Sequence, residues 1–452
     1  MVPTELGTEK VSKLLKQYAM PAIIAMTATS LYNMVDSIFI GQGVGPLAIS
    51  GLAVTFPLMN LSTAFGTLVG VGAATLISML LGQKNYKLAN RVLGNVVMLN
   101  VGIGAIVTIL ALAFLNPILY FFGASDATIS YARDYMIIIM GFNIISHLYF
   151  GLNGVIRASG HPKQAMLATV LTVSINAVLD PIFIFGFKMG IQGAAVATIL
   201  AQIAGLTWVC NILAKKDEVL HFSRGIFKFD FRIAQRSLAI GLSPFLMNVA
   251  ACFVVILINN QLKRYGGDLA IGAYGIVNRI AFLFIMINMG FTQGMQPIAG
   301  YNYGAKQYDR VKEVLRLTIM CATVCTTLGF LCGELIPDTL VSLFTRDAEL
   351  KALASHALRI MVSSFWILGF QIVISNFFQC IGHAKKAIIL SLSRQLLFLV
   401  PFLIIFPSFW GIEGVWWSMP ASDIVAAFLA LIMIHNLMKT FGKEGAPEEK
   451  VL

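Results

Sequence analysis

Residues 92–114, VLGNVVMLNVGIGAIVTILALAF, contain no charged side chain. At about 1.5 Å per residue, a helix of this length crosses the roughly 30 Å hydrocarbon core of a bilayer. A helix also satisfies its own backbone hydrogen bonds in lipid, and the stretch is too long and too uniformly apolar for an alternating barrel strand. It therefore predicts a membrane-spanning helix.

Similar apolar stretches recur from end to end. Hydrophobic residues make up 58% of the chain and charged residues only 12%, a balance far from that of soluble domains. We predict an all-α polytopic membrane protein with twelve transmembrane helices, at residues 17–40, 49–81, 92–114, 130–155, 165–187, 190–213, 237–261, 272–302, 314–335, 355–380, 387–407 and 411–437.

The distribution of basic residues tests this count. If both termini are cytoplasmic, 23 of the 32 lysines and arginines lie at the termini and even-numbered loops, against seven on the opposite side. Such a bias marks the cytoplasmic side of multi-pass proteins. We therefore expect a plasma (inner) membrane protein with both termini cytoplasmic. The basic residues form no stripe with interleaved aromatic residues, so no nucleic acid is expected as a partner.

The second half of the sequence repeats the first at a shift of 221 or 222 residues. GQKNY, SGHPK and GIQG in the first half match GAKQY, IGHAK and GIEG in the second. Because each repeat has an even number of spans, both copies share one orientation, related by a pseudo-twofold axis along the membrane normal. The predicted parts are a leader at 1–16, six-helix bundles at 17–213 and 237–437, a connector at 214–236 and a tail at 438–452. The connector sequence FSRGIFKFDFR suits either a short interfacial helix or an ordinary tether.

Two acids lie inside predicted spans of the first bundle. Asp36 belongs to YNMVDSIFIG, with Asn33 one turn earlier on the same face. Asp180 belongs to SINAVLDP, with Asn176 at i−4. An ionisable group at mid-membrane costs several kcal/mol, so each acid is a functional candidate by default. The alternative is that each acid has only a structural role and forms a hydrogen bond to a neighbouring helix.

The surroundings of Asp180 are rich in oxygen. Pro181, also a candidate hinge, removes the amide that would bond the Ala177 carbonyl. Carboxylate, amide and hydroxyl oxygens, such as that of Thr198, suit a sodium ion or a shuttled proton, whereas zinc or copper would need His or Cys. Two carboxylates in one dry site also titrate as a coupled pair, as a proton-release switch requires. We expect H⁺ or Na⁺ as coupling ion, and no cofactor or other metal.

Five other charged, histidine or proline residues within the spans each allow two interpretations. Asp423 serves packing or gating, and His147 is a proton carrier or a hydrogen-bonded structural residue. Arg279 and Arg394 either snorkel to an interface or take part in function. Pro21 is a hinge of the first span or a permanent kink.

The second bundle carries hardly any acid but many Met, Phe and amide side chains. Such a surface adapts to varied amphipathic molecules, although Met and Phe also pack ordinary membrane helices. The candidate substrate-cavity residues are Asn33, Met247, Met286, Met289, Gln293, Gln371 and Asn376. Because no GxxxxGK[ST] motif occurs, an ATPase site is not expected, and we interpret the chain as a transporter rather than an enzyme.

Together these residues resemble the multidrug and toxic compound extrusion (MATE) family. The resemblance rests on YNMVDSIFIGQG, the repeated LGQKNY loop, and Asn176, Asp180 and Pro181 followed by GIQGAAVAT. It implies two bundles of six helices, alternating access, and export of amphipathic, often cationic drugs in exchange for sodium or protons. The missing acids in spans seven and ten make the chain similar to the DNA-damage-inducible and staphylococcal branch. The cation-site residues that the resemblance implies are Asp36, Asn153, Asn176, Asp180 and Thr198.

The residues leave other functions open. A flippase for a lipid-linked oligosaccharide has a related repeat but should present a basic cavity, and only two basic residues lie well inside spans. An ion channel should carry a repeated filter-like loop, which is not evident. Export of an endogenous metabolite fits as well as drug export. We expect a monomeric, cation-coupled efflux transporter whose partners are amphipathic or cationic small molecules and the lipid bilayer.

Overall fold

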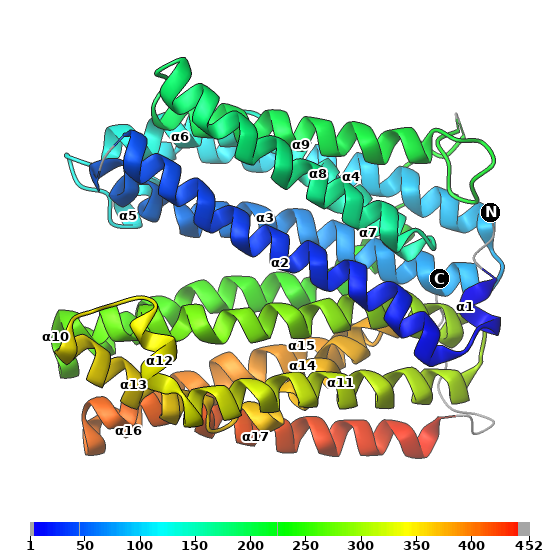
Figure 1. Ribbon diagram of the computed structural model, residues 1–452. Coiled ribbons are helices and arrows are strands. Elements are labelled where there is room, and N and C mark those ends of the chain that lie inside the picture. The colour runs from blue at the N-terminus through cyan, green and yellow to red at the C-terminus, as the bar shows by residue number, and fades with distance from the viewer. Residues whose placement is uncertain (1–3, 45, 224, 442–452) are drawn as a thin grey trace. The chain divides into compact units, whose positions relative to one another are not determined.

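The computed structural model describes residues 4–44, 46–223 and 225–441, apart from the side chains of 33–35, 37, 38, 41, 42, 46, 49, 268 and 440. Every regular element in this part of the chain is a helix (Figure 1). The α-helices are α1 (Glu5–Thr8), α2 (Val11–Gly43), α3 (Pro46–Gly82), α4 (Tyr86–Ala113), α5 (Leu115–Phe121), α6 (Ile129–Gly141), α7 (Asn143–Ala158), α8 (Pro162–Pro181), α9 (Ile191–Leu213), α10 (Phe231–Gly304), α11 (Tyr308–Leu335), α12 (Pro337–Ser342), α13 (Ala348–Val362), α14 (Phe365–Cys380), α15 (Ala384–Leu392), α16 (Val400–Trp410) and α17 (Ile412–Thr440). Two π-helices join them, η1 (Ile182–Gly186) and η2 (Ser393–Leu399).

The helices follow the twelve predicted spans. Among the described residues, nine helical segments are long and apolar enough to cross a membrane, and two bent pairs raise the number to eleven. The remaining predicted span is α2, several of whose side chains lie outside the described part. The seventh and eighth spans run together as α10, which leaves helical geometry at Gly267, where φ is 69°.

The fourth and tenth spans are each broken, which the sequence analysis did not predict. Helix α6 meets α7 at a bend of 56°, and α13 meets α14 at a bend of 54°. The breaks fall beside Phe142 and Ser364, which correspond at a shift of 222 residues. Ser363 contributes to the second break because its hydroxyl donates to the Ile360 carbonyl at 2.6 Å, in competition with the helix backbone.

The chain divides into two compact units. In the described part, unit 1 contains residues 4–9 and 24–245, and unit 2 contains residues 10–23 and 246–441. These boundaries differ from the predicted ones at 17–213 and 237–437. The start of α2 groups with unit 2, and the connector with the start of α10 groups with unit 1.

Glycines explain why the start of α10 belongs to unit 1. A Cβ on Gly241 would strike the backbone carbonyl of Leu68 in α3, and one on Gly72 would strike the carbonyl of Ser237. The backbones of α3 and α10 therefore approach more closely than side chains would allow. Small residues at a helix contact permit this approach.

The start of α2 packs into unit 2 in the same way. Gly290 and Gly294 of α10 lie against Ile23 and Ala19, and a Cβ on Gly294 would come within 2.6 Å of the Ala19 backbone. At a shift of 222 residues, Gly294 corresponds to Gly72. The two halves of the sequence repeat therefore form equivalent close helix contacts, one in each unit.

The repeat is also visible in the backbone conformation. Lys84 and Lys306 both have φ of 58°, a left-handed conformation uncommon outside glycine. In each case the next amide bonds to the carbonyl five residues earlier, at 2.9 and 2.8 Å, which closes a Schellman cap. Gly190 and Gly411, each at the start of a helix, likewise share φ of 58°.

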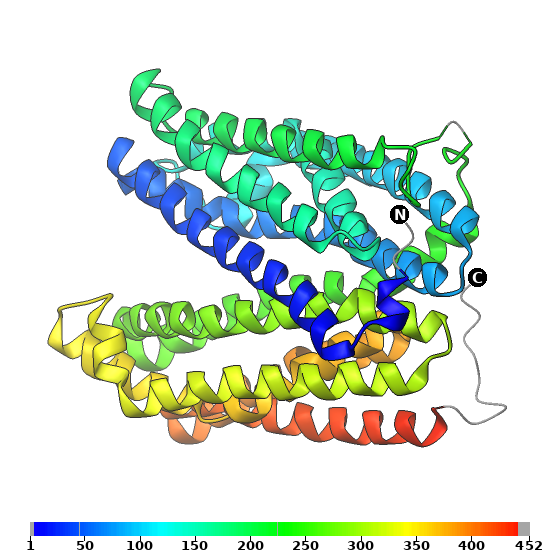
Figure 2. The ribbon, with the colours of Figure 1, turned by 45° about the vertical axis from the view of Figure 1, so that its right-hand side comes forward.

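The connector forms no interfacial helix in its described residues, which leaves the alternative of a tether, here held by side chains of α4. Its described residues between α9 and α10 form no helix, and Figures 1 and 2 show them beside the start of α4. Asn90 Nδ2 donates to the Val219 carbonyl at 2.6 Å, and Asn95 Nδ2 donates to the Lys228 carbonyl at 3.3 Å. Gly94 between them meets the backbone of the connector. Side chains of α4 thus replace the backbone bonds that a helix would have made.

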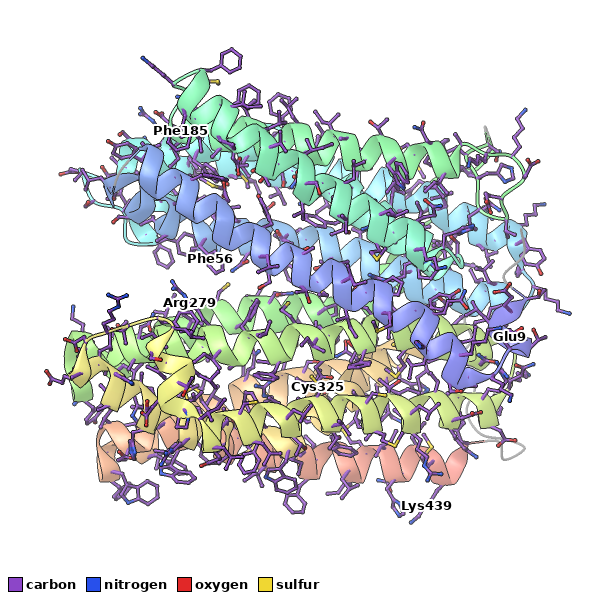
Figure 3. All side chains as sticks on the ribbon, in the orientation of Figure 1. Glu9, Phe56, Phe185, Arg279, Cys325 and Lys439 are labelled. Carbon is purple, nitrogen blue, oxygen red and sulfur yellow. The ribbon has the colours of Figure 1, made fainter. Side chains whose placement is uncertain are left out.

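Each unit has its own buried core. The core of unit 1 includes Leu119, Tyr135 and Met136, and that of unit 2 includes Leu262 and Trp416. The exposed side chains of both units are also largely apolar, as the sticks in Figure 3 show. Lipid-facing helices are expected to be apolar outside as well as inside, so close packing rather than exclusion of water holds them together.

Candidate functional site

The predicted acids of the first bundle come together in unit 1. Asp36 on α2 is 6% exposed, and Asp180 on α8 is fully buried. Their carboxyl groups lie close enough to interact electrostatically. Two neighbouring carboxylates in a dry site repel each other unless a proton or another cation neutralises one of them. The described arrangement therefore fits a pair that shares a proton.

Two further predicted residues belong to the same cluster. Asn176 Nδ2 donates to Asp180 Oδ1 and to Thr198 Oγ1, each at 3.3 Å. Asn176 reaches the acid because the two residues stand four apart on α8 and so share a face. Thr198 donates its own proton to the Ala194 carbonyl at 3.0 Å. Its oxygen can therefore only accept from the other members.

Two tyrosines complete the cluster, and the sequence analysis did not predict either. The hydroxyl of Tyr32 lies 3.2 Å from Thr198 Oγ1 and donates to it, because the threonine proton is already used. Tyr135 on α6, 1% exposed, also lies near Thr198. Tyr32 stands four residues before Asp36, a spacing that pointed to it. Tyr135 comes from another span and carries no comparable signal.

Three oxygens of the cluster have no hydrogen-bond donor among the described residues. They are Asp36 Oδ1, Asn176 Oδ1 and Asp180 Oδ2, all buried. A buried acceptor without a donor is costly. A proton or a sodium ion would satisfy such oxygens, whereas zinc or copper would prefer nitrogen or sulfur. The residues present therefore fit the cation expected from the sequence.

The backbone is irregular directly after the acid. Helix α8 ends at Pro181, and η1 follows. Proline cannot donate to the carbonyl four residues earlier, and single π-turns often occur at functional sites. Pro21 lies inside α2, two residues before its division between the two units. That Pro21 and Pro181 act as hinges stays a prediction.

Asn153 lies in a different polar cluster. Its Nδ2 donates to Thr169 Oγ1 at 3.2 Å. Thr169 stands seven residues before Asn176 on α8, about 10 Å along the helix. The structure therefore does not place Asn153 among the residues that contact Asp36 and Asp180.

The candidate substrate-cavity residues other than Asn33 belong to unit 2 and are buried or half-buried. The side chain of Asn33 lies outside the described part. Gln371 is buried, and its Nε2 donates to Ser375 Oγ at 3.1 Å. Met289 packs against the core of unit 2. The other half-buried members are Met247, Met286, Gln293 and Asn376. Their contact with substrate stays a prediction.

The structure distinguishes between the remaining polar groups of the spans. His147 is 1% exposed and donates from Nε2 to the Ser62 carbonyl at 2.9 Å, which fits the structural interpretation. Arg394 is paired with Asp423, at 2.8 Å between Nε and Oδ1. Arg279, labelled in Figure 3, is exposed on α10.

Comparison with known proteins adds a consistent set of matches. The family model described as MatE matches residues 21–182 and 240–405. The chain is 30% identical over 430 residues to multidrug export protein MepA of Staphylococcus haemolyticus, covering 94% of this chain and 93% of that protein. The identity to MepA of Staphylococcus aureus is 28% over 427 residues, 94% of each chain.

Solved structures give the same result. The MATE multidrug transporter DinF-BH is 36% identical, with a TM-score of 0.90 over 96% of this chain and 98% of that one. A multidrug resistance MATE family transporter in an outward-facing conformation is 25% identical, with a TM-score of 0.91 over 97% and 99% of the two chains.

Proposed function

Because the chain belongs to the MATE family of multidrug efflux transporters, we propose that it exports amphipathic, often cationic compounds by antiport with protons or sodium. The relatives named as multidrug export proteins support the substrate class. The observation that carries the coupling is that two buried acids, Asp36 and Asp180, share one polar cluster inside a predicted membrane-spanning bundle. Three oxygens of that cluster without donors are suited to a cation.

The cation acts by holding two helices together. Asp36 belongs to α2 and Asp180 to α8, so a proton or a sodium ion between them joins these helices. When the cation leaves, two negative charges face each other in a dry site and repel. The position of this part of α2 therefore depends on cation occupancy, and Pro21 gives the helix a place to bend.

Exchange follows if substrate and cation favour different positions of α2. A ligand shifts a conformational equilibrium only as far as its affinities for the two states differ. Cation binding at Asp36 and Asp180 then favours release of the substrate, and substrate binding favours release of the cation, because such coupling is reciprocal. Alternation of this kind produces export driven by the cation gradient.

The test is ethidium transport in proteoliposomes under an imposed proton or sodium gradient. The wild type should move ethidium against one of the two gradients, and Asp36→Asn should lose at least about 90% of that movement because it removes the charge that the cation neutralises. Asp309→Asn is the matched control, since Asp309 is fully exposed at the start of α11. Ethidium export by the wild type without any gradient, or full gradient-driven export by Asp36→Asn, would contradict the proposal.

A further inference from the structure

Unit 2 contains a buried charge pair that the proposed coupling does not use. Asp423 on α17 is 4% exposed. Its Oδ1 accepts from Arg394 Nε at 2.8 Å, and its Oδ2 accepts from Ser364 Oγ at 2.9 Å. Both carboxylate oxygens therefore have a donor. In unit 1, Asp36 and Asp180 each keep an oxygen without one.

The partners of Asp423 come from two irregular points of unit 2. Ser364 stands at the bend of 54° between α13 and α14. Arg394 lies in η2, where the wider π-turn redirects side chains relative to an α-helix. Neither position is an ordinary helix interior. The two departures from helical geometry bring a hydroxyl and a guanidinium to one carboxylate.

In the described part of unit 2, the charged group that faces Asp423 is Arg394. Helices α14 and α16, which pack against α17, carry no charged residue. On α13, Arg359 is exposed and His356 pairs with Glu413 at 2.7 Å. Glu413 stands ten residues before Asp423, about 15 Å along α17. On α15, Lys385 is exposed and Lys386 lies over the ring of Phe378.

Unit 1 has no charge at the corresponding places. At the shifts of the repeat, Arg394 corresponds to Thr172 and Asp423 to Gln202. Thr172 donates to its own helix, at 2.9 Å to the Ala168 carbonyl, and Gln202 accepts from Ser146. Unit 2 thus has a carboxylate and a cation together where unit 1 has two neutral side chains. The pair is not an inherited copy of the Asp36–Asp180 cluster.

We propose that Asp423 and Ser364 form a second cation site of the protein and that Arg394 is its resident cation. An arginine side chain keeps its charge throughout the physiological range, so it neutralises Asp423 without a proton or a sodium ion from solution. Removing it leaves a buried, unpaired carboxylate, which needs a new counter-charge. The site then takes a small monovalent cation. The consequence for transport, coupling through Asp36 and Asp180 alone, rests on the proposed function.

The test removes Arg394 from a protein in which the Asp36–Asp180 site has been inactivated by substitution. In purified Asp36→Asn/Asp180→Asn protein, proton uptake per chain is measured between about pH 8 and pH 5, and binding of radioactive sodium is measured at about pH 8. Adding Arg394→Met should add about one bound proton or sodium ion per chain. Arg279→Met is the matched control, because it removes an exposed arginine from another span (Figure 3) and should add none.

A second substitution assigns the new cation to its carboxylate. Adding Asp423→Asn to Arg394→Met should abolish the extra cation. No extra cation in folded Arg394→Met protein, or an extra cation that survives Asp423→Asn, overturns the proposal. If Arg394→Met does not fold, recovery of folding by Asp423→Asn supports charge pairing, and failure to recover overturns it. A failure of drug antiport leaves these results untouched, since the background lacks the first site.

Discussion

Thr198 has an unusual position among the residues of unit 1, because its single oxygen links side chains from several helices. It accepts from Asn176 and Tyr32 and donates its proton to its own helix. The Tyr32 proton is therefore not used on a carboxyl oxygen, and Asp36 Oδ1 and Asp180 Oδ2 stay available for a cation. The hydroxyl organises the cluster without itself carrying charge.

We predict that Thr198→Val weakens cation coupling without abolishing transport. Valine keeps the shape of threonine but removes the oxygen that accepts from both Tyr32 and Asn176. The loss of one such bond is worth about 0.5–1.5 kcal/mol, so the cation concentration for half-maximal ethidium export should rise about two- to tenfold. Thr169→Val, in the separate cluster of Asn153, should leave that concentration unchanged. An equal shift in both variants would mean that the effect is not specific to the site.

From the sequence we could predict the site residues that carry, or are spaced to contact, a charge inside an apolar span. Asp36 and Asp180 stand out because charge is rare in an apolar span, and Asn176 follows from its spacing to Asp180. Tyr135 could not be predicted, because a tyrosine is ordinary in a span and its contact with Thr198 depends on the packing of α6 against α9. Asn153, placed by resemblance alone, instead contacts Thr169, two helical turns before Asn176 on α8.

Elements of this chain meet through glycine where their backbones come closest. Gly72 and Gly241 are two such points, and the structure leaves no room for a Cβ at either. The contrast is Gly102 on α4, around which a Cβ would meet nothing within 4 Å. The same residue type is therefore required at one helix position and dispensable at another.

We predict opposite effects for two glycine-to-alanine changes. Gly241→Ala forces α10 away from α3, and overpacking of this kind costs about 1–3 kcal/mol, so the apparent melting temperature in detergent should fall. Gly102→Ala meets open space and gains helix propensity of up to about 1 kcal/mol, so the melting temperature should stay or rise. A stable, fully active Gly241→Ala protein would show that the close approach is not needed.

The repeated caps at Lys84 and Lys306 offer a second prediction about elements. Glycine adopts the left-handed conformation without strain, whereas other L-residues pay about 1–2 kcal/mol for it. Lys84→Gly should therefore raise the apparent melting temperature. Lys84→Ala removes the same charge but keeps the strain, and it should not raise the melting temperature. If both variants gain alike, removal of the charge rather than relief of strain is the cause.

Helix positions were predictable and helix irregularities were not. A stretch of twenty apolar residues has one stable form in a bilayer, which explains why α9 and α17 coincide closely with predicted spans. The bends beside Phe142 and Ser364 depend instead on local competition for backbone bonds, such as that of Ser363. The connector was also unpredictable, because its conformation is set by Asn90 and Asn95 of a distant helix.

At the scale of the whole chain, one duplicated plan carries two different charge arrangements. Unit 1 has acids with unsatisfied oxygens, and unit 2 has an acid already paired with arginine. The repeat could be predicted from the matched loop sequences, but this difference in charge pairing between the two units could not. It depends on where the π-turn of η2 places Arg394.

The topology itself is open to a direct check. With both termini cytoplasmic, the connector lies inside the cell and the segment between the third and fourth spans lies outside. A membrane-impermeant maleimide should label Asp126→Cys on intact cells, and Lys216→Cys only after permeabilisation. Both positions are exposed, and none of the six native cysteines is. The reverse pattern would invert the assigned orientation.

The π-turn of η1 also has a consequence for the gene. A π-turn closes its backbone bonds one residue later than an α-turn does, so it holds one residue in excess of regular helix. Deleting a single codon within 182–186 would let the segment revert to α-helix while α8 and α9 keep their faces. The same deletion inside α9 would rotate every later side chain of that helix by about 100°. Length variation of one residue among natural relatives should therefore gather at η1.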